Sequence, residues 1–447
     1  MPDAVYQVMR MLCALVEPLP VGTNLGLLHL LWMLVSGRLL AARGALFPGL
    51  AACGLSDRAL RRAWGALGQG DWTSGRLLGA WAAAVAEEGQ WRAHAHGGYR
   101  PLAVDVTGFW RPRLRGCPTT HYHGVARRAL PAIPLGLVAG VGSVGPQRLA
   151  LPRAFVRADP ADPAPRAHER RLIREAVRQC AADEALVLDG GFGVALLQEE
   201  GAARYVVRAA KNATFRRAAP PPYRGRGRPP TRGAVVRPLP RTHQGRVLPA
   251  TPPDQIETWH EDDTVLRAEV WRDLVLPDAA AGSPPFTAVA LHDPRHRAPL
   301  LLVTPLALPP RAVRDLYRDR WPVEQLPLAA KQMLGAARQF VHAPETCQRL
   351  PELTLLAGAV LSYAAATAPA IPTGFWDRRP QPTPGRLRRL LARTPFPHDF
   401  PLPARIREKA TVTAHLPQGF WGQRRRRAPA PAMPSAPDET PTLGVAA

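Results

Sequence analysis

The sequence predicts an α/β protein in which helices flank a mixed sheet, with a helical region before the sheet and a β-rich insertion within it. Three observations support this prediction. Apolar patterns typical of helices fill residues 1–97, and strand-like patterns begin at Tyr99. Short apolar strands and helices then alternate. A run rich in Pro, Gly and Arg interrupts them between about residues 216 and 299.

Composition limits the class of protein and its partners. The chain has 447 residues, enough for two or three domains with a sizeable core. Hydrophobic residues make up 46% and charged residues 21%, which is typical of a globular protein. The net charge of +23 predicts a polyanionic partner, most simply nucleic acid. A GC-rich coding sequence would also enrich Arg, Ala, Pro and Gly, so part of the arginine excess has that explanation.

Cysteine usage argues against a disulfide framework. The five cysteines are scattered, odd in number and contain no Cys-x-x-Cys pair, which fits a reducing compartment. Cys117, His121 and His123 lie close together in the sequence. Their spacing matches no strong metal-binding pattern, so a structural or exposed role is favoured over a metal site.

Targeting and membrane signals are weak. The opening Met1-Pro2-Asp3-Ala4 lacks a basic region, so no signal peptide is expected. The apolar run 25–35 is too short to span a membrane. The run 353–376 is long enough, but Pro369 and Pro372 interrupt it. Both runs predict buried core helices, and no membrane partner is expected.

The N-terminal region reads as consecutive helices. A helix is expected over residues 25–42, and Ser56 is a plausible N-cap for a basic helix over 57–64. Another helix should follow Thr73 and run to about Glu88. The basic helix after a Gly-Leu-Ser turn fits a DNA-reading helix-turn-helix and a plain helical bundle equally well.

The middle of the chain predicts three strands, a helix, a strand, a helix and a strand, an order that suits a mixed sheet with helices on its faces. Beyond the insertion we expect a core strand, two helices around a polar motif, a basic helix and a disordered end. The strands are expected at 101–107, 135–144, 148–155, 185–188, 204–208 and 300–304, and the helices at 168–180, 194–200, 310–317, 353–367 and 386–393.

A polar motif between residues 317 and 331 stands out. Tyr317, Arg320, Glu324 and Lys331 would share one face of a helix. Only three of the 58 basic residues are lysines, so a lysine here is unlikely by composition alone. A face with two cations, a carboxylate and a phenol fits a site that handles phosphate and metal. The alternative is an ordinary amphipathic helix with a solvated charged face.

Two further acids interrupt or end apolar strands. Asp105 lies within the first strand and Asp189 ends the fourth. A buried carboxylate is costly unless a cation or hydrogen bonds satisfy it. Together with Glu324, they could hold one or two Mg²⁺ ions that act on a phosphodiester. Taken singly, each acid has a simpler explanation. Asp105 could form a turn at a strand end, Asp189 could cap a helix N-terminus, and Glu324 could be an exposed acid on a helix.

These residues resemble those of a known family. Tyr317, Arg320, Glu324 and Lys331 match the Tyr-x2-Arg-x3-Glu-x6-Lys signature of DDE transposases of the insertion-sequence class. The run Arg320-Trp321-x-Val323-Glu324 is also similar to that family, as is Asp189-Gly190-Gly191-Phe192 around the second acid. The resemblance covers roughly residues 99–365. The match to the family's motifs is specific around Glu324, good around Asp189 and moderate around Asp105.

The resemblance implies a fold and an activity. The fold would be a ribonuclease-H-like core with a β-rich insertion between the second acid and the glutamate. Asp105, Asp189 and Glu324 would be the catalytic, metal-binding acids for two Mg²⁺ ions, with Mn²⁺ as the alternative. Tyr317, Arg320 and Lys331 would contact DNA phosphates. The protein would cleave transposon ends and join the freed 3′-hydroxyl to target DNA, as a homodimer on double-stranded DNA in the bacterial cytoplasm, at the nucleoid.

The same resemblance sets the domain boundaries that we expect. They are a helical region at 1–97, for which DNA binding is one reading, the first part of the catalytic core at 98–215, the insertion at 216–299, the end of the core at 300–368 and a basic, Pro-rich, partly disordered region at 369–447. One departure from the family concerns Pro327. A proline at that depth should kink the glutamate helix or force it to restart.

Secondary signals for DNA binding lie outside the core motif. Arg226 and Arg228 belong to an Arg-Gly-Arg-Pro run that resembles an AT-hook, a motif that enters a narrow minor groove; the alternative is an arginine-rich surface loop. Four arginines at 424–427 should add salt-dependent affinity. Trp259 and Trp271 are candidates to hold a flipped base, although core packing is the commoner use of such residues.

Two other functional readings remain open. A catalytically inactive, transposase-derived DNA-binding protein would keep the same core. A structure-specific nuclease on the same fold would cleave DNA without strand transfer. All three acids are present in the sequence, which favours the active enzyme.

Overall fold

The computed structural model describes residues 2–162, 164–223, 225, 231–280 and 282–409. Residues Met1–Arg407 form one compact unit, and the structure discussed below lies within it. Arg226 and Arg228 of the AT-hook-like run fall outside the described residues, as do the four arginines at 424–427.

The described N-terminal residues form six consecutive helices. Ser56 caps α5 as the sequence predicts, because its side chain accepts a hydrogen bond from the Ala59 backbone N–H. Thr73 caps α6 in the same way through Arg76. The helix expected over 25–42 is instead two helices, because the backbone turns at Gly37, where φ is +69°. The helices are α1 (Asp3–Val16), α2 (Thr23–Val35), α3 (Arg38–Ala41), α4 (Leu46–Ala51), α5 (Asp57–Gln69) and α6 (Ser74–Glu88).

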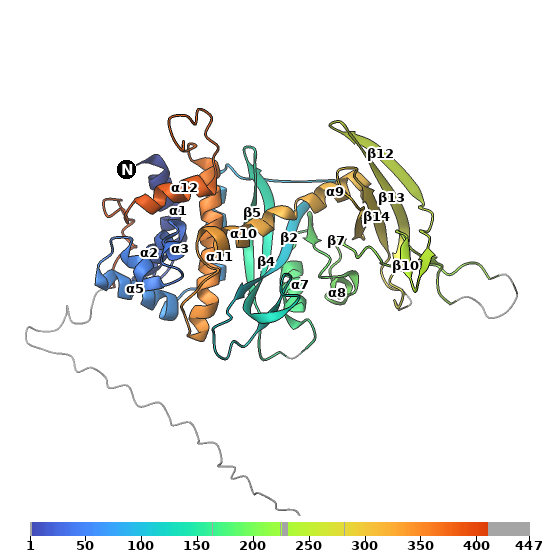
Figure 1. Cartoon of the computed structure of the whole chain (residues 1–447), viewed down its shortest axis with the longest axis horizontal. Coiled ribbons are helices and arrows are strands. Elements are labelled where there is room, and N and C mark those ends of the chain that lie inside the picture. Colours follow the sequence, from blue (N-terminus) through green and yellow to red (C-terminus); the bar gives the residue numbers. More distant parts are fainter. Residues whose placement is uncertain (1, 163, 224, 226–230, 281, 410–447) are drawn as a thin grey trace, which may run out of the picture. The chain divides into compact units, whose positions relative to one another are not determined.

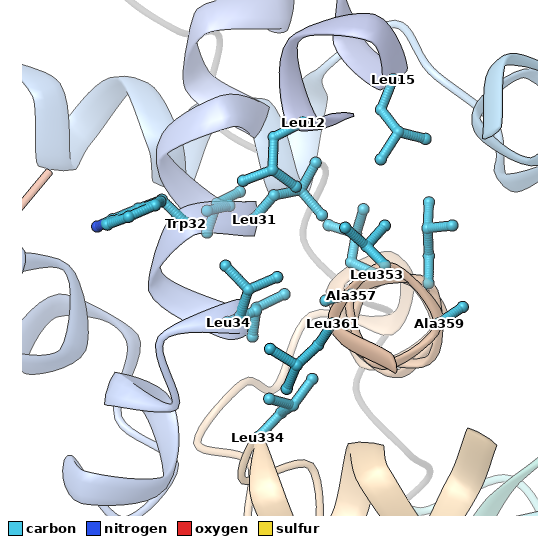
Figure 2. Close-up of a cluster of buried hydrophobic side chains, with 14 of the residues drawn as sticks. Leu12, Leu15, Leu31, Trp32, Leu34, Leu334, Leu353, Ala357, Ala359 and Leu361 are labelled. Atoms are coloured by element: carbon cyan, nitrogen blue, oxygen red, sulfur yellow. The ribbon is translucent and has the colours of Figure 1, made fainter. Parts of the chain in front are cut away.

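A long apolar helix, α11 (Pro344–Thr367), joins these helices to the sheet. Leucines of α1 and α2 pack against α11, and Leu334 lies in the same cluster (Figure 2). On its other side, α11 contacts the sheet strands (Figure 1). The N-terminal helices therefore share a hydrophobic core with the helix that supports the sheet.

Helix α11 is also the one described helix that is long and apolar enough to cross a membrane. Most of its apolar window is buried inside the protein. Such burial is what the core helix of a soluble protein shows.

A mixed sheet forms the centre of the protein, and the elements predicted for it are confirmed. Strands β5, β4, β2, β6 and β7 are neighbours in that order. The first three are antiparallel, whereas β2, β6 and β7 run parallel. The elements follow one another as β2 (Arg100–Trp110), β4 (Arg128–Val144), β5 (Gln147–Arg157), α7 (Ala167–Gln179), β6 (Glu184–Leu188), α8 (Val194–Glu199) and β7 (Tyr205–Arg208).

Alternate residues of β2 face opposite layers. Leu102 and Val104 belong to a core that includes Leu172 and Ile173 of α7. Ala103 and Phe109 belong instead to the core that includes α11. Because strand side chains alternate, Asp105 faces the same side as Ala103. Helices thus cover both faces of the sheet (Figure 1).

The β-rich run between residues 215 and 292 continues the same sheet. β15 pairs with β7 on one edge and with β14 on the other, and β13 and β12 extend the sheet further. β10 and β11 form a separate pair. These strands are β8 (Phe215–Arg217), β9 (Val235–Val236), β10 (Arg241–His243), β11 (Arg246–Leu248), β12 (Gln255–Glu261), β13 (Thr264–Val275), β14 (Phe286–His292) and β15 (Leu300–Thr304).

The remaining described elements lie around this framework. Two short strands, β1 (Arg92–Ala93) and β3 (Thr120–His123), pair with β4. Helix α12 (Pro384–Arg393) packs on α11. Helices α9 (Pro310–Arg318) and α10 (Trp321–Leu328) follow β15 and are followed by a π-helical turn, η1 (Ala329–Met333). α10 packs across β2, β4 and β5, which carries its side chains to the face that Asp105 shares.

A buried ion pair holds α11 to β5 and gives a first testable prediction. Arg157 binds Glu352 through two hydrogen bonds of 2.7 and 2.8 Å, and the Glu352 side chain is 1% exposed. Arg157→Ala would leave that carboxylate buried without its cation. Because the Arg157 side chain is itself 34% exposed, we expect a loss of about 2 kcal/mol, less than for a fully buried pair. Urea unfolding measures it.

The control is the double variant Arg157→Met with Glu352→Leu. Replacing both charges with apolar side chains removes the unpaired carboxylate, so it should recover much of the lost stability. If Arg157→Ala unfolds at the same urea concentration as wild type, the pair does not hold these elements together.

Candidate active site

Asp105 and Asp189 lie side by side on neighbouring parallel strands. The last register pair of β2 and β6 joins Val104 to Leu188, and the two aspartates are the next residues. Neighbouring strands are about 4.8 Å apart. Val104 and Leu188 pack in the core beneath α7, so the alternation of side chains directs the aspartates to the opposite face.

Asp105 is a partly buried carboxylate that feels the charges of two other acids. Burial raises its pKa to about 6, against a usual value of 3.8. A hydrogen bond from the Val106 backbone N–H and the charge of Arg320 lower the pKa, whereas the charges of Glu324 and Asp189 raise it. Glu324 and Asp189 therefore both act electrostatically on Asp105. The three carboxylates do not belong to the group of described residues whose ligand atoms lie within 4.8 Å of one another.

Asp189 is the more accessible of the two aspartates. It follows β6 and precedes a Gly-Gly turn that is closed by the Phe192 N–H bonding to the Asp189 carbonyl. The Tyr317 hydroxyl donates to its Oδ1 at 3.5 Å, and Arg208 Nη1 lies 3.8 Å from the same oxygen. Its side chain is 45% exposed, so Asp189 can reach a ligand that approaches from solvent.

Glu324 is held in place by Arg320. Their side chains form an ion pair of 2.6 Å across one turn of chain. The Arg320 guanidinium also lies 5.7 Å from the centre of the Tyr317 ring. Its Nε is buried without a partner among the described residues. Arg320 thus links Tyr317 to Glu324 and retains an unused donor.

Lys331 joins the site from the π-helical turn. Its Nζ donates to Thr107 Oγ1 at 2.7 Å and lies 5.2 Å from the centre of the Phe109 ring. Burial lowers its pKa to about 8, while the negative charge of Asp105 acts in the opposite direction. Lys331 therefore stands beside the first aspartate rather than beside the glutamate.

The motif does not lie on a single helix, which corrects the sequence-based expectation. α9 ends at Arg318, Arg320 lies between helices, and α10 carries the glutamate. Pro327 is inside α10, and the chain switches to a π-helical turn two residues later. Because proline has no N–H, the hydrogen-bond ladder must change there. A helix break near Pro327 was expected, and it turns Lys331 toward Thr107.

Several residues next to the site lie outside the motif, and they were not predicted from the sequence to lie there. Thr107 lies two residues beyond Asp105 on the same strand face, so the strand period could have identified it. Arg208 ends β7, and its approach to Asp189 depends on the pairing of β6 with β7. The pKa of His121 is lowered by burial and then by the positive charge of Lys331, which places His121 near the site as well.

Other candidates from the sequence have structural roles or lie outside the site. Trp271 is fully buried and donates to the backbone of the insertion. Trp259 packs against a small core. The Cys117 thiol donates to backbone carbonyls. Among the described residues, Cys117 does not belong to the cluster of His and acid side chains that could hold a metal.

Comparison with known proteins assigns neither a family nor a function to the chain. No protein-family model matches the chain, and no curated protein matches it. The assignment must therefore come from the acids, the cations around them and the sequence motif.

The site suggests a second prediction, on Lys331. If its charge contacts phosphate, raising the pH from 7 to 9 removes that charge, because its pKa is about 8. A lost charge-assisted hydrogen bond of about 1.4 kcal/mol corresponds to roughly tenfold weaker DNA binding. Fluorescence anisotropy with labelled DNA in EDTA measures this change.

Lys331→Arg keeps its charge at pH 9 and should lose much less affinity than wild type. Lys409→Arg is the matched control, because Lys409 is exposed and lies far along the chain from the motif and from both aspartates. Equal losses in wild type and Lys331→Arg would show that Lys331 does not contribute a phosphate contact.

Proposed function

We propose that the protein is a DNA transposase that cleaves transposon ends and joins the freed 3′-hydroxyl to target DNA. The observation that carries the proposal is that Asp189 and Glu324 both act electrostatically on Asp105, which lies beside Asp189 in the parallel register of β2 and β6. The motif residues Tyr317 and Arg320 contact two of these acids. Such a set of acids and cations suits phosphodiester chemistry better than a solvated helix face does.

The order of the elements supports a ribonuclease-H-like core. The resemblance implies strands and helices in the order β2, β4, β5, α7, β6, α8 and β7, with the first acid on a strand and the second at a strand end. It also implies a β-rich insertion before the glutamate helix. The elements observed between residues 100 and 328 follow this order. On this proposal the insertion extends the core sheet.

The three carboxylates fit Mg²⁺ or Mn²⁺. Hard divalent cations prefer carboxylate oxygens. Burial chiefly raises the pKa of Asp105, and the charges of Glu324 and Asp189 add to it, so a bound cation would stabilise the ionised carboxylate. Asp105, Asp189 and Glu324 would hold two ions, and bound Mg²⁺ would supply charge neutralisation at the phosphate that reacts.

The chain's own residues would then position the reactants. Arg320 holds Glu324, and its Nε is buried without a partner among the described residues. The Tyr317 hydroxyl orients Asp189. Lys331 places a cation beside Asp105. Phosphoryl transfer depends mostly on such positioning and charge stabilisation.

The reaction has two balanced steps. Water attacks the phosphorus at the transposon end, and the bond to the 3′-oxygen breaks, leaving a 3′-hydroxyl and a 5′-phosphate. That hydroxyl then attacks a target phosphodiester, forms a new bond to phosphorus and releases a target 3′-hydroxyl. No oxidant or external energy source is needed.

The proposed partner is double-stranded DNA. The net charge of +23 favours it, and arginines dominate the basic residues. We propose that two copies act together on the two transposon ends, in the cytoplasm of a bacterium. Binding of end DNA should weaken steeply with rising salt.

The test is cleavage of DNA that carries the inverted repeats flanking the coding region. We expect nicks at the repeat ends in Mg²⁺, none in EDTA, and joined products with a target plasmid. Binding without cleavage would instead support an inactive DNA-binding protein. Cleavage without joining would support a structure-specific nuclease.

A further inference from the structure

A cluster of two histidines and an aspartate lies next to the four motif residues, and the resemblance assigns it no role. His94, His96 and Asp319 bring their ligand atoms within 4.8 Å of one another. His94 Nδ1 lies 2.9 Å and His96 Nε2 lies 2.7 Å from the same oxygen, Asp319 Oδ2. Two imidazoles and one carboxylate therefore converge on one point.

The backbone fixes each histidine. The His94 N–H bonds to the Val141 carbonyl of β4 at 3.1 Å. His96 exchanges two backbone hydrogen bonds with Tyr99 across a turn in which Gly97 and Gly98 both have positive φ. Glycine adopts this conformation without the steric cost that a Cβ atom would add. The histidines are thus held before any ligand arrives.

Asp319 is fixed from the other side. Its side chain is 3% exposed. Arg148 forms an ion pair with Oδ1 and also donates to the Arg318 carbonyl at 3.0 Å. This occupies one carboxylate oxygen and leaves Oδ2 to the histidines, as an outer-shell partner does for a metal-ligating carboxylate. Although burial raises the pKa of Asp319, the His96 hydrogen bond and the charges of His94 and Arg148 hold it below its usual value.

We propose that His94, His96 and Asp319 form a binding site for a zinc-class divalent ion. Two imidazole nitrogens and one carboxylate oxygen are a common three-ligand set for Zn²⁺, with the fourth position open. In a tetrahedral site with bonds of about 2.0–2.1 Å, ligand atoms lie about 3.4 Å apart. The observed separations of 2.7 and 2.9 Å need a shift of roughly half an ångström. The histidine side chains are 22% and 26% exposed, which gives an ion access.

The location suggests what the ion does. Asp319 is the C-cap of α9 and directly precedes Arg320, which holds Glu324. An ion here would clamp the junction between α9 and α10 to β1 and the turn that follows it. The three residues would be positioning residues for the acidic site, at a distance from the reacting phosphate. Metal binding at the cluster does not depend on the proposed transposase activity.

The test measures zinc on the purified full-length protein. After dialysis against EDTA and then Zn²⁺, we expect one zinc per chain in Asp105→Asn/Glu324→Gln, because that double variant keeps the cluster. His94→Ala, His96→Ala and Asp319→Asn should each lose this zinc. Arg148→Met should weaken zinc binding about 10- to 100-fold, as loss of an outer-shell partner does. Co²⁺ should give a tetrahedral absorption band in wild type and not in His96→Ala.

His123→Ala is the matched control, because this histidine lies on β3 away from the cluster. Circular dichroism of the metal-free variants checks that each is folded. Zn²⁺ should raise the melting temperature of wild type and His123→Ala but leave that of His96→Ala unchanged. Equal zinc content in wild type and His96→Ala, or no zinc in wild type, would overturn the proposal. Failure of DNA cleavage alone would bear on the acidic site instead.

Discussion

Glu324→Gln should reduce Mg²⁺-dependent DNA cleavage by at least about 10³-fold, which corresponds to about 4 kcal/mol of transition-state stabilisation. The amide keeps the shape of the side chain but removes the charge that would hold a divalent ion. It also takes the anionic partner from Arg320. The measurement is the single-turnover rate of nicking on end DNA at saturating protein.

A DNA-binding measurement on Glu324→Gln distinguishes a loss of catalysis from a loss of folding. Removing one negative charge from the proposed phosphate-binding site should leave DNA affinity unchanged or raise it slightly. Glu257→Gln, on β12, is the matched control and should cleave at the wild-type rate. Cleavage by Glu324→Gln within tenfold of wild type would exclude Glu324 as a ligand needed for the reaction.

Asp105→Asn should stabilise the metal-free protein above about pH 6. The pKa of Asp105 rises from 3.8 to about 6 on folding, chiefly through burial. Between these values the folded state holds a proton that the unfolded state lacks, so stability falls as pH rises through this window. Above it, the ionised carboxylate costs on the order of 2–3 kcal/mol. Asparagine avoids this cost.

Urea unfolding in EDTA at pH 8 and at pH 3.5 measures the effect. The variant should gain stability at pH 8 and little at pH 3.5, where Asp105 is largely protonated in both states. Asp278→Asn changes a carboxylate whose side chain is 96% exposed, so its stability should match that of wild type at both pH values. Mg²⁺ should stabilise wild type and not Asp105→Asn. A variant less stable than wild type at pH 8 would contradict the account of this site.

Local sequence patterns identified most elements because these depend on nearby residues. Strand 300–304 was predicted with the bounds that β15 has. The Ser56 cap follows from one side chain and one backbone N–H. Asp105 and Asp189 stood out because each carries charge into an apolar strand, and this holds whatever the strands pair with.

Features that depend on long-range pairing could not be read from the sequence. That Asp105 meets Asp189 follows from the parallel register of β2 and β6. Helical spacing predicted that the four motif residues share one helix face, but the break between α9 and α10 at Arg320 separates them. His94 and His96 are visible as a pair, but Asp319 lies more than two hundred residues away, and no local pattern connects them.

Anomalous scattering from Mn²⁺ in crystals of the full-length protein tests the central claim most directly. The account predicts manganese bound by the carboxylates of Asp105, Asp189 and Glu324, with two ions about 3.5–4 Å apart when DNA is present. Carboxylates more than about 10 Å apart in that structure, too far to share ions, or manganese bound only elsewhere, would contradict it.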